Sequence, residues 1–312
     1  MNTEMSRRDF LALSTVLAGA ACLPARASAQ ASPTRLILLG TGGGPRPRVG
    51  SMSSAQVIIA GGRLYVVDCG DGVARQLVLA GATLTALRSV FITHHHSDHN
   101  AGYGNLLLLA WASGLNTRVD AYGPPPLSHI TELFLEMSEE DISIRVADEG
   151  RAPLGPLVHA HDVAAAGLVM QDENVKVTCA VVPHPLVKTA LAYRLDTADR
   201  SIVISGDTAR SDALLQLARG ADVLVHEALF PAAVDRLAAR VPSATTLKAH
   251  LFAAHTTAED CGRVAAAAGV KTLVLSHFVP ADDPLVTEQM WADAARLHFD
   301  GRIVVGRDLM EI

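Results

Sequence analysis

Short apolar runs separated by turn-forming residues recur along most of the chain and predict β-strands. The first clear run, Arg35–Leu39, ends in the glycine-rich turn 40–45. Two further runs, Val57–Ala60 and Leu64–Val67, flank Gly61-Gly62, a pair typical of a hairpin turn. Runs of the same kind predict strands at 89–93, 175–182, 201–204, 223–225, 273–275 and 302–305.

Helical periodicity alternates with these strands in the second half of the chain. Apolar spacing predicts helices at 211–219 and 257–268, and Thr257 is a suitable N-cap for the second helix. Helices are also expected at 73–80 and 127–137. Strands that are grouped early and alternate with helices later favour a layered α/β fold.

The segment from about 124 to 172 has a different pattern. It combines one predicted helix with the acidic patch Glu139-Glu140-Asp141 and contains little that suggests a core. An insertion or pocket lid fits this pattern, and a solvated helix with loops fits it equally well.

Composition and charge narrow the class of protein. The chain has 312 residues, 49% of them hydrophobic, which suits a globular domain with a large core. No Pro/Ser/Gly-rich linker or repeat follows the N-terminal region, which favours one domain over residues 30–312. The formal net charge of −6 argues against a polyanion as main ligand, so no nucleic acid is expected as partner. Cys69, Cys179 and Cys261 lack C-x-x-C spacing and are expected to be buried thiols.

The first 29 residues have the features of a signal peptide. Arg7-Arg8 stands directly before the apolar run Leu11–Leu23, and Ala27-Ser28-Ala29 offers a cleavage site. The run is short for a bilayer-spanning helix, which needs about 20 residues. We therefore predict a twin-arginine signal over residues 1–29, export to the periplasm or medium, and no stable membrane insertion after cleavage. An ordinary signal or membrane anchor is the alternative, and lipidation at Cys22 is less favoured.

A histidine-rich segment directly after the strand at 89–93 indicates metal chemistry. It reads Thr-His-His-His-Ser-Asp-His from Thr93 to His99. Imidazole and carboxylate groups are common zinc ligands. In an extended loop the side chains of His94 and His96 point the same way and would bind one ion, whereas Asp98 and His99 would turn towards a second.

Three later strands repeat this arrangement. Each is a short apolar run that ends in one ligand-type residue, namely His184, Asp207 and His277. Strand ends that meet at one rim can hold metal ligands rigidly. The sequence therefore predicts that these three side chains join the 94–99 segment in a single site.

Together, the H-x-H-x-D-H segment, His184, Ser205-Gly206-Asp207-Thr208 and Ser276-His277 resemble the metallo-β-lactamase superfamily. The resemblance implies a four-layer αββα sandwich with two Zn²⁺ ions at one edge of the sheets, although Mn²⁺ or Fe could replace zinc. It assigns the first ion to His94, His96 and His184, and the second to Asp98, His99 and His277. Asp207 would bridge the two ions. Related folds often dimerise, so a homodimer is possible, and the sequence leaves the oligomeric state open.

Two further motifs are similar to the ribonuclease Z-like branch, which includes arylsulfatase-like and cyclic phosphodiesterase members. They are His226-Glu227-Ala228 and the segment from His255 to Glu259. By this resemblance His226 would protonate the leaving group, steadied by Glu227. His255 and Thr256 would bind the substrate anion at a helix N-terminus. A structural role for both histidines is the alternative.

These features predict an exported dinuclear zinc hydrolase. Metal-bound hydroxide, steered by Asp98, would attack a small phosphodiester or an aryl sulfate ester. Hydrolysis of a β-lactam or lactone on the same site is the first alternative. A tRNA 3′-processing activity is less expected, because the short interval between His184 and Asp207 leaves no room for the long arm of tRNA-processing ribonuclease Z enzymes. A non-catalytic metal-binding protein is an alternative of another class.

Overall fold

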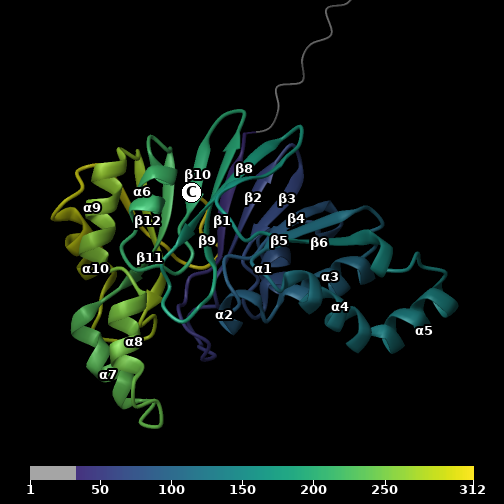
Figure 1. Cartoon of the computed structure of the whole chain (residues 1–312), viewed down its shortest axis with the longest axis horizontal. Helices are drawn as coiled ribbons and strands as arrows, with labels where there is room; N and C mark the ends of the chain where they lie inside the picture. Colours follow the sequence, from purple (N-terminus) through teal and green to yellow (C-terminus); the bar gives the residue numbers. More distant parts are fainter. Residues whose placement is uncertain (1–32) are drawn as a thin grey trace, which may run out of the picture. The chain divides into compact units, whose positions relative to one another are not determined.

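The computed structural model describes residues 33–312 (Figure 1). The predicted signal peptide at 1–29, including Cys22, lies outside the described residues. Within 33–312 no helix combines the length and apolar character needed to cross a membrane. Cys69, Cys179 and Cys261 are buried free thiols, as expected.

The first sheet contains six strands in the order β1-β2-β3-β4-β5-β6. β1, β2 and β3 pair antiparallel and include the predicted hairpin, whereas β3 to β6 pair in parallel. The strands are β1 (Arg35–Gly40), β2 (Ala55–Ala60), β3 (Arg63–Val67), β4 (Leu87–Phe91), β5 (Val119–Gly123) and β6 (Val158–Asp162).

The second sheet contains seven strands in the order β13-β12-β11-β10-β9-β8-β7. Its β10 to β13 half is parallel and its β7 to β10 half is antiparallel. The strands are β7 (Gly167–Gln171), β8 (Val175–Val182), β9 (Ala190–Thr197), β10 (Ser201–Ile204), β11 (Val223–Leu229), β12 (Thr272–Val279) and β13 (Arg302–Val305).

Helices cover the outer faces of both sheets (Figure 1). α1 and α3 pack on the first sheet, and α6, α9 and α10 pack on the second. The helices are α1 (Val73–Leu79), α2 (Ser97–Asn100), α3 (Tyr103–Ala112), α4 (Leu127–Met137), α5 (Glu139–Glu149), α6 (Asp212–Ala218), α7 (Val234–Ala239), α8 (Leu247–Ala254), α9 (Ala258–Ala268) and α10 (Glu288–Arg296), with short 3-10 turns at Leu84–Ala86, Gly155–Leu157 and Pro231–Ala233.

The inner faces of the two sheets share one apolar core. Phe91 of the first sheet packs against Tyr193 of the second, with ring centroids 5.5 Å apart. Leu36 and Tyr65 join them from the first sheet, and Ile204 joins them from the second. Because side chains alternate along a strand, each sheet also presents an apolar outer face to its helices. The layers are helix, sheet, sheet and helix, which confirms the predicted sandwich.

The segment 124–172 supplies an edge strand to each sheet. β6 pairs with β5, and β7 pairs with β8. Between them α5 is exposed or half-buried along its whole length, as a solvated helix is. That this segment is an insertion stays a prediction.

Two strands run further than the sequence predicted. β11 continues past Val225 to Leu229, and β12 continues past Leu275 to Val279. The two strands pair with each other along this extension, which explains why they continue. His226, Glu227 and His277 therefore lie within strands rather than after them.

Candidate metal centre

The segment after β4 brings the first group of ligand-type side chains together. Nε2 of His94 lies 3.0 Å from Nδ1 of His96, which lies 3.3 Å from Nε2 of His184. His184 comes from the turn after β8, in the other sheet. These three histidines and Asp207 form one cluster of potential metal ligands.

A second group of ligand-type side chains lies beside the first. Asp98 and His99 occupy the first turn of α2 and meet His277 from β12. Nε2 of His277 lies 3.1 Å from Nε2 of His99 and 3.3 Å from Oδ2 of Asp98. The structure thus brings together residues that are almost 180 positions apart in sequence.

Asp207 lies between the two groups. Its Oδ1 is 3.2 Å from Nε2 of both His99 and His277, and its Oδ2 is 3.8 Å from Nε2 of His94. Gly206, which precedes it, has a φ of +58°. A Cβ there would lie 2.8 Å from the carbonyl oxygen of Leu191, so the turn that presents Asp207 requires glycine.

The geometry of the seven side chains fits divalent cations. Neighbouring nitrogen ligands of a tetrahedral zinc are roughly 3.3 Å apart, given bonds of about 2.0 Å. The ring-nitrogen separations in both groups, 3.0 to 3.3 Å, are close to this value. Oδ1 of Asp207 is buried and has no hydrogen-bond partner within residues 33–312. A buried acceptor without a partner is costly, and a bound cation would satisfy it.

Hydrogen bonds on the far side of the rings orient two of the ligands. Nδ1 of His99 donates to Oδ2 of Asp68 at 2.7 Å, and Nδ1 of His184 donates to the carbonyl of Ala254 at 3.1 Å. Each bond occupies Nδ1 and leaves Nε2 directed into the site, an arrangement common around zinc. Burial also lowers the pKa of His184 to about 4, so the ring is neutral at pH 7, as ligation requires.

Charge complementarity keeps the central carboxylate ionised. Burial alone would raise the pKa of Asp207, but its interactions with His277 and His99 outweigh burial and hold the pKa well below its usual range. An ionised carboxylate between two imidazole groups is suited to bind cations on both sides.

His255 and Glu227 form a hydrogen-bonded pair beside the ligands. His255 follows α8 and lines the cavity that opens onto these ligands. Its ring is stacked on that of His277, with the ring centroids 5.9 Å apart. Its Nδ1 donates to Oε2 of Glu227 at 3.2 Å. Burial would lower the pKa of His255, but the charge and hydrogen bond of Glu227 raise it to about 9. The ring can therefore carry a proton at neutral pH.

His226 does not lie where the sequence analysis placed it. Its side chain is fully buried, its Nδ1 donates to the carbonyl of Glu227 at 2.8 Å, and it is not among the residues that line the cavity. Side chains alternate along β11, so the orientation that brings Glu227 to the site turns His226 away from it. The expected proton donor is thus displaced from the cavity, and Glu227 contacts His255 instead.

Thr256 also differs from its expected role as a substrate ligand. Its backbone N–H donates to Oε1 of Glu227 at 2.8 Å, and its hydroxyl donates to the carbonyl of Thr208 at 2.7 Å. Both groups are used inside the protein, and the residue is buried. The following residue, Thr257, caps α9 as predicted. Thr256 therefore positions Glu227, whereas His255 faces the cavity.

Three residues at the site were missed in the sequence analysis. Asp68, directly after β3, binds His99 and Thr93 through its carboxylate. The backbone N–H of Gly44 donates to Oδ2 of Asp98 at 2.8 Å. His250 of α8 lines the cavity with its ring 5.9 Å from that of His184. A carboxylate at a strand end was a usable indication for Asp68, whereas no motif pointed to His250.

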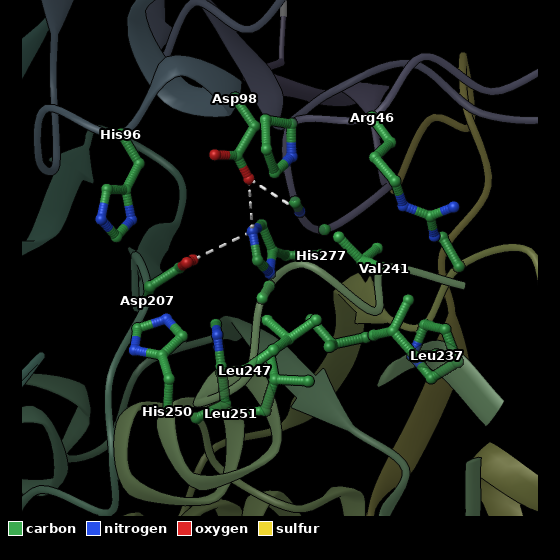
Figure 2. A pocket seen from close by; sticks show the side chains of 18 of the residues that line it. Arg46, His96, Asp98, Asp207, Leu237, Val241, Leu247, His250, Leu251 and His277 are labelled. Carbon is green, nitrogen blue, oxygen red and sulfur yellow. Dashed lines mark hydrogen bonds and ion pairs between the residues drawn. The ribbon is translucent and has the colours of Figure 1, made fainter. Parts of the chain in front are cut away.

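A cavity of about 350 Å³ opens onto the metal site. Figure 2 shows His96, Asp98 and Asp207 on one side and Leu237 and Val241 on the other. The glycine-rich turn contributes Gly43 and Gly44 to the lining. Helices α7 and α8 supply the opposite wall, and none of residues 124–172 lies in the lining.

Comparison with known proteins defines the class of protein. A family model described as "Beta-lactamase superfamily domain" matches residues 63–278, more than half of the chain. Together with the sandwich and the clustered ligands, this match shows that the chain belongs to the metallo-β-lactamase superfamily and is a metal-dependent hydrolase.

Sequence relatives define the branch. "Ribonuclease Z" of Mycobacterium bovis (strain BCG / Pasteur 1173P2) is 32% identical over 280 residues, which cover 89% of this chain and 97% of that protein. The chain therefore belongs to the ribonuclease Z-like branch of the superfamily.

Solved structures show the same fold. The metallo-β-lactamase fold protein YhfI from Bacillus subtilis superimposes with a TM-score of 0.67 at 20% identity, covering 90% of this chain and 99% of that chain. The short form of human tRNase Z superimposes with a TM-score of 0.66 at 22% identity, covering 89% and 98% respectively.

Proposed function

We propose that this hydrolase cleaves a small phosphodiester. The observation that carries the proposal is His255, which lines the same cavity as members of both groups of metal ligands and is hydrogen-bonded to the buried Glu227. Cleavage of a phosphodiester requires an activated water on one side and a proton for the departing oxygen on the other. The site has candidate residues for both requirements.

The seven clustered side chains would hold the metal ions. We propose His94, His96 and His184 for one ion, Asp98, His99 and His277 for the other, and Asp207 for both. A histidine-rich set with carboxylates suits zinc, and the same set would accept manganese or iron. Two bound ions would lower the pKa of an attacking water and neutralise charge that develops on the ester.

The protein's own groups would complete the reaction. Asp98 lines the cavity, and the N–H of Gly44 fixes its Oδ2, so that its carboxylate can orient the attacking water. His255 bonds to Glu227 through Nδ1, which leaves Nε2–H to donate a proton to the leaving oxygen. Glu227 holds the ring in this orientation and is itself fixed by the N–H of Thr256.

Cleavage of precursor RNA is the second candidate, because the curated relatives are named ribonuclease Z. Two observations favour a smaller substrate. The chain between His184 and Asp207 contains only β9, β10 and their short connections, without an added arm. The net charge of −6 offers little general attraction for a polynucleotide.

We also propose that the chain is exported through the twin-arginine route, on the basis of Arg7-Arg8 and the cleavage site at 27–29. Replacement of Arg7-Arg8 by Lys-Lys should retain the protein in the cytoplasm, as cell fractionation would show. The homodimer suggested by the resemblance is likewise a proposal, which light scattering of the purified protein would test.

A panel of substrates tests the proposed reaction. Metal-loaded protein would be assayed with bis-p-nitrophenyl phosphate, p-nitrophenyl sulfate, nitrocefin and a precursor tRNA, beside a His277→Ala variant. The proposal predicts metal-dependent turnover of the phosphodiester that His277→Ala abolishes. Preferred turnover of the sulfate ester, of nitrocefin or of the precursor tRNA would replace it with the corresponding alternative.

A further inference from the structure

One side of the cavity is apolar, and the proposed reaction does not use it. We define the α7–α8 wall by the apolar side chains that line the cavity from these helices and their connection, namely Leu237, Val241, Ala244, Leu247 and Leu251. His250 of α8 also lines the cavity but lies beside His184 and is not part of the wall. Val279, Pro280 and Ala281, from the end of β12 onward, extend it. Figure 2 shows Leu237, Val241 and Leu247 across the cavity from His96 and Asp98.

The α7–α8 wall is fixed relative to the metal ligands. Leu237 and Leu251 pack with Val279 in a small apolar cluster of their own. Val279 lies on β12, the strand that also carries His277. On the other side Gly43 abuts both residues, since a Cβ there would lie 2.7 Å from Val279 and 2.8 Å from the His277 ring. The wall and the metal site are therefore connected through β12.

A salt bridge strengthens this attachment. Nε of Arg236 on α7 lies 2.7 Å from Oδ2 of Asp283, whose side chain is buried. Asp283 follows β12, so the pair connects α7 to the chain beyond the metal ligand. A hydrogen-bonded ion pair with one buried partner holds its geometry better than an exposed pair does.

The wall leaves apolar surface uncovered at a reactive site. Val241 and Leu247 are half-buried and Ala244 is exposed. Among residues 33–312, Arg46 is the only lysine or arginine in the cavity lining, and its guanidinium lies 3.5 Å from Asp282. Apolar surface in a concave site is suited to bind apolar ligand groups. The lining lacks the cluster of cations that would bind a second phosphate.

We propose that the substrate is an ester with an uncharged apolar group, about the size of a single ring, that binds the α7–α8 wall while its anionic head lies at the metal site. This inference rests on the proposed function and names the class of its substrate: an aryl or branched-alkyl ester rather than a nucleotide or a polynucleotide. The polar half of the cavity serves the reaction, and the apolar half selects the substrate.

Binding of phosphonates tests this inference without turnover. Methylphosphonate and phenylphosphonate have the same anionic head and differ only in the organic group. Calorimetry with the metal-loaded full chain should give a Kd for phenylphosphonate that is lower by about tenfold or more, since burial of a ring contributes more than the roughly 1.4 kcal/mol that corresponds to tenfold. Equal Kd values would overturn the inference.

Variants locate the selectivity on the wall. Val241→Ser and Leu247→Ser should each reduce the ratio of the two Kd values severalfold. Phe252→Ser is the matched control, because Phe252 lies on the same helix α8, is 46% exposed and does not line the cavity. It should keep the wild-type ratio. An equal decrease in Phe252→Ser, or an unchanged ratio in both wall variants, would contradict the role of the wall.

A bulky substitution provides an independent check. Val241→Trp should fill part of the cavity and weaken phenylphosphonate binding at least as much as Val241→Ser does. Tighter binding of phenylphosphonate to both variants than to wild type would contradict the inference.

The outcomes separate this inference from the proposed reaction. Phenylphosphonate selectivity without phosphodiester turnover would reject the reaction and keep the apolar specificity. Phosphodiester turnover without any selectivity would keep the reaction and reject the apolar specificity.

Discussion

The two sides of the cavity are built in different ways. The metal side consists of side chains at or near strand ends, anchored in the large core between the sheets. The opposite side consists of α7 and α8, two short helices that share a small apolar cluster. Substitutions in the wall can therefore change the substrate without disturbing the metal ligands. Substitutions at the strand ends should affect every substrate alike.

The largest effect is expected from Asp207→Ala on the metal side. Asp207 contacts histidines of both ligand groups, so its loss should release metal and lower kcat/KM by at least about a thousandfold for every ester, since metal ions supply several kcal/mol. Elemental analysis and steady-state kinetics would measure both effects. Full metal content in this variant would show that Asp207 is not a ligand.

The next effect is expected from His255→Gln. Loss of a positioned proton donor should lower kcat by at least about a hundredfold while the metal content stays at the wild-type level. His226→Gln is the matched control, because the buried His226 lies away from the cavity. Its folded protein should keep its kcat although its free energy of unfolding falls. A larger loss of kcat in His226→Gln than in His255→Gln would restore the original assignment of His226.

Asp68→Asn should have an intermediate effect through His99. The amide keeps the shape of the carboxylate but removes the charge that holds the ring at 2.7 Å. Metal affinity should fall by about tenfold to a hundredfold, with kcat largely restored at saturating metal. Competition with a chelator would measure the affinity. Unaltered affinity would show that Asp68 serves only the fold.

The smallest effect is expected from Glu227→Gln and depends on pH. Glu227 raises the pKa of His255 to about 9, so in the wild type the ring keeps its proton up to that pH. Without the negative charge the pKa of His255 should fall towards or below 6.5. As the pH is raised, the variant should therefore lose activity earlier than the wild type does. The alkaline limb of the plot of kcat/KM against pH should therefore shift to lower pH. A limb that stays in place would indicate that another group donates the proton.

The metal side could be predicted from sequence because its ligands come shortly after apolar runs in the sequence. The six-residue motif 94–99 is compact, and His184 and Asp207 come just after β8 and β10. The orientation of His226 could not be predicted, because it depends on β11 continuing to Leu229 through its pairing with β12. Pairing between strands distant in sequence leaves no local pattern.

The α7–α8 wall was missed for another reason. α7 has six residues and α8 has eight, too short for a clear helical period. Their stability comes from contacts with Leu229 and Val279 at the ends of β11 and β12. Only the tertiary structure brings these segments together. The half of the cavity that we propose to select the substrate can therefore be recognised only in the folded protein.

The number of metal ions per chain tests most directly whether ligands from both sheets form one centre that binds two metal ions. We predict two divalent ions in the wild type and one in His277→Ala, which retains His94, His96 and His184. The same number of ions in His277→Ala as in the wild type would contradict the account.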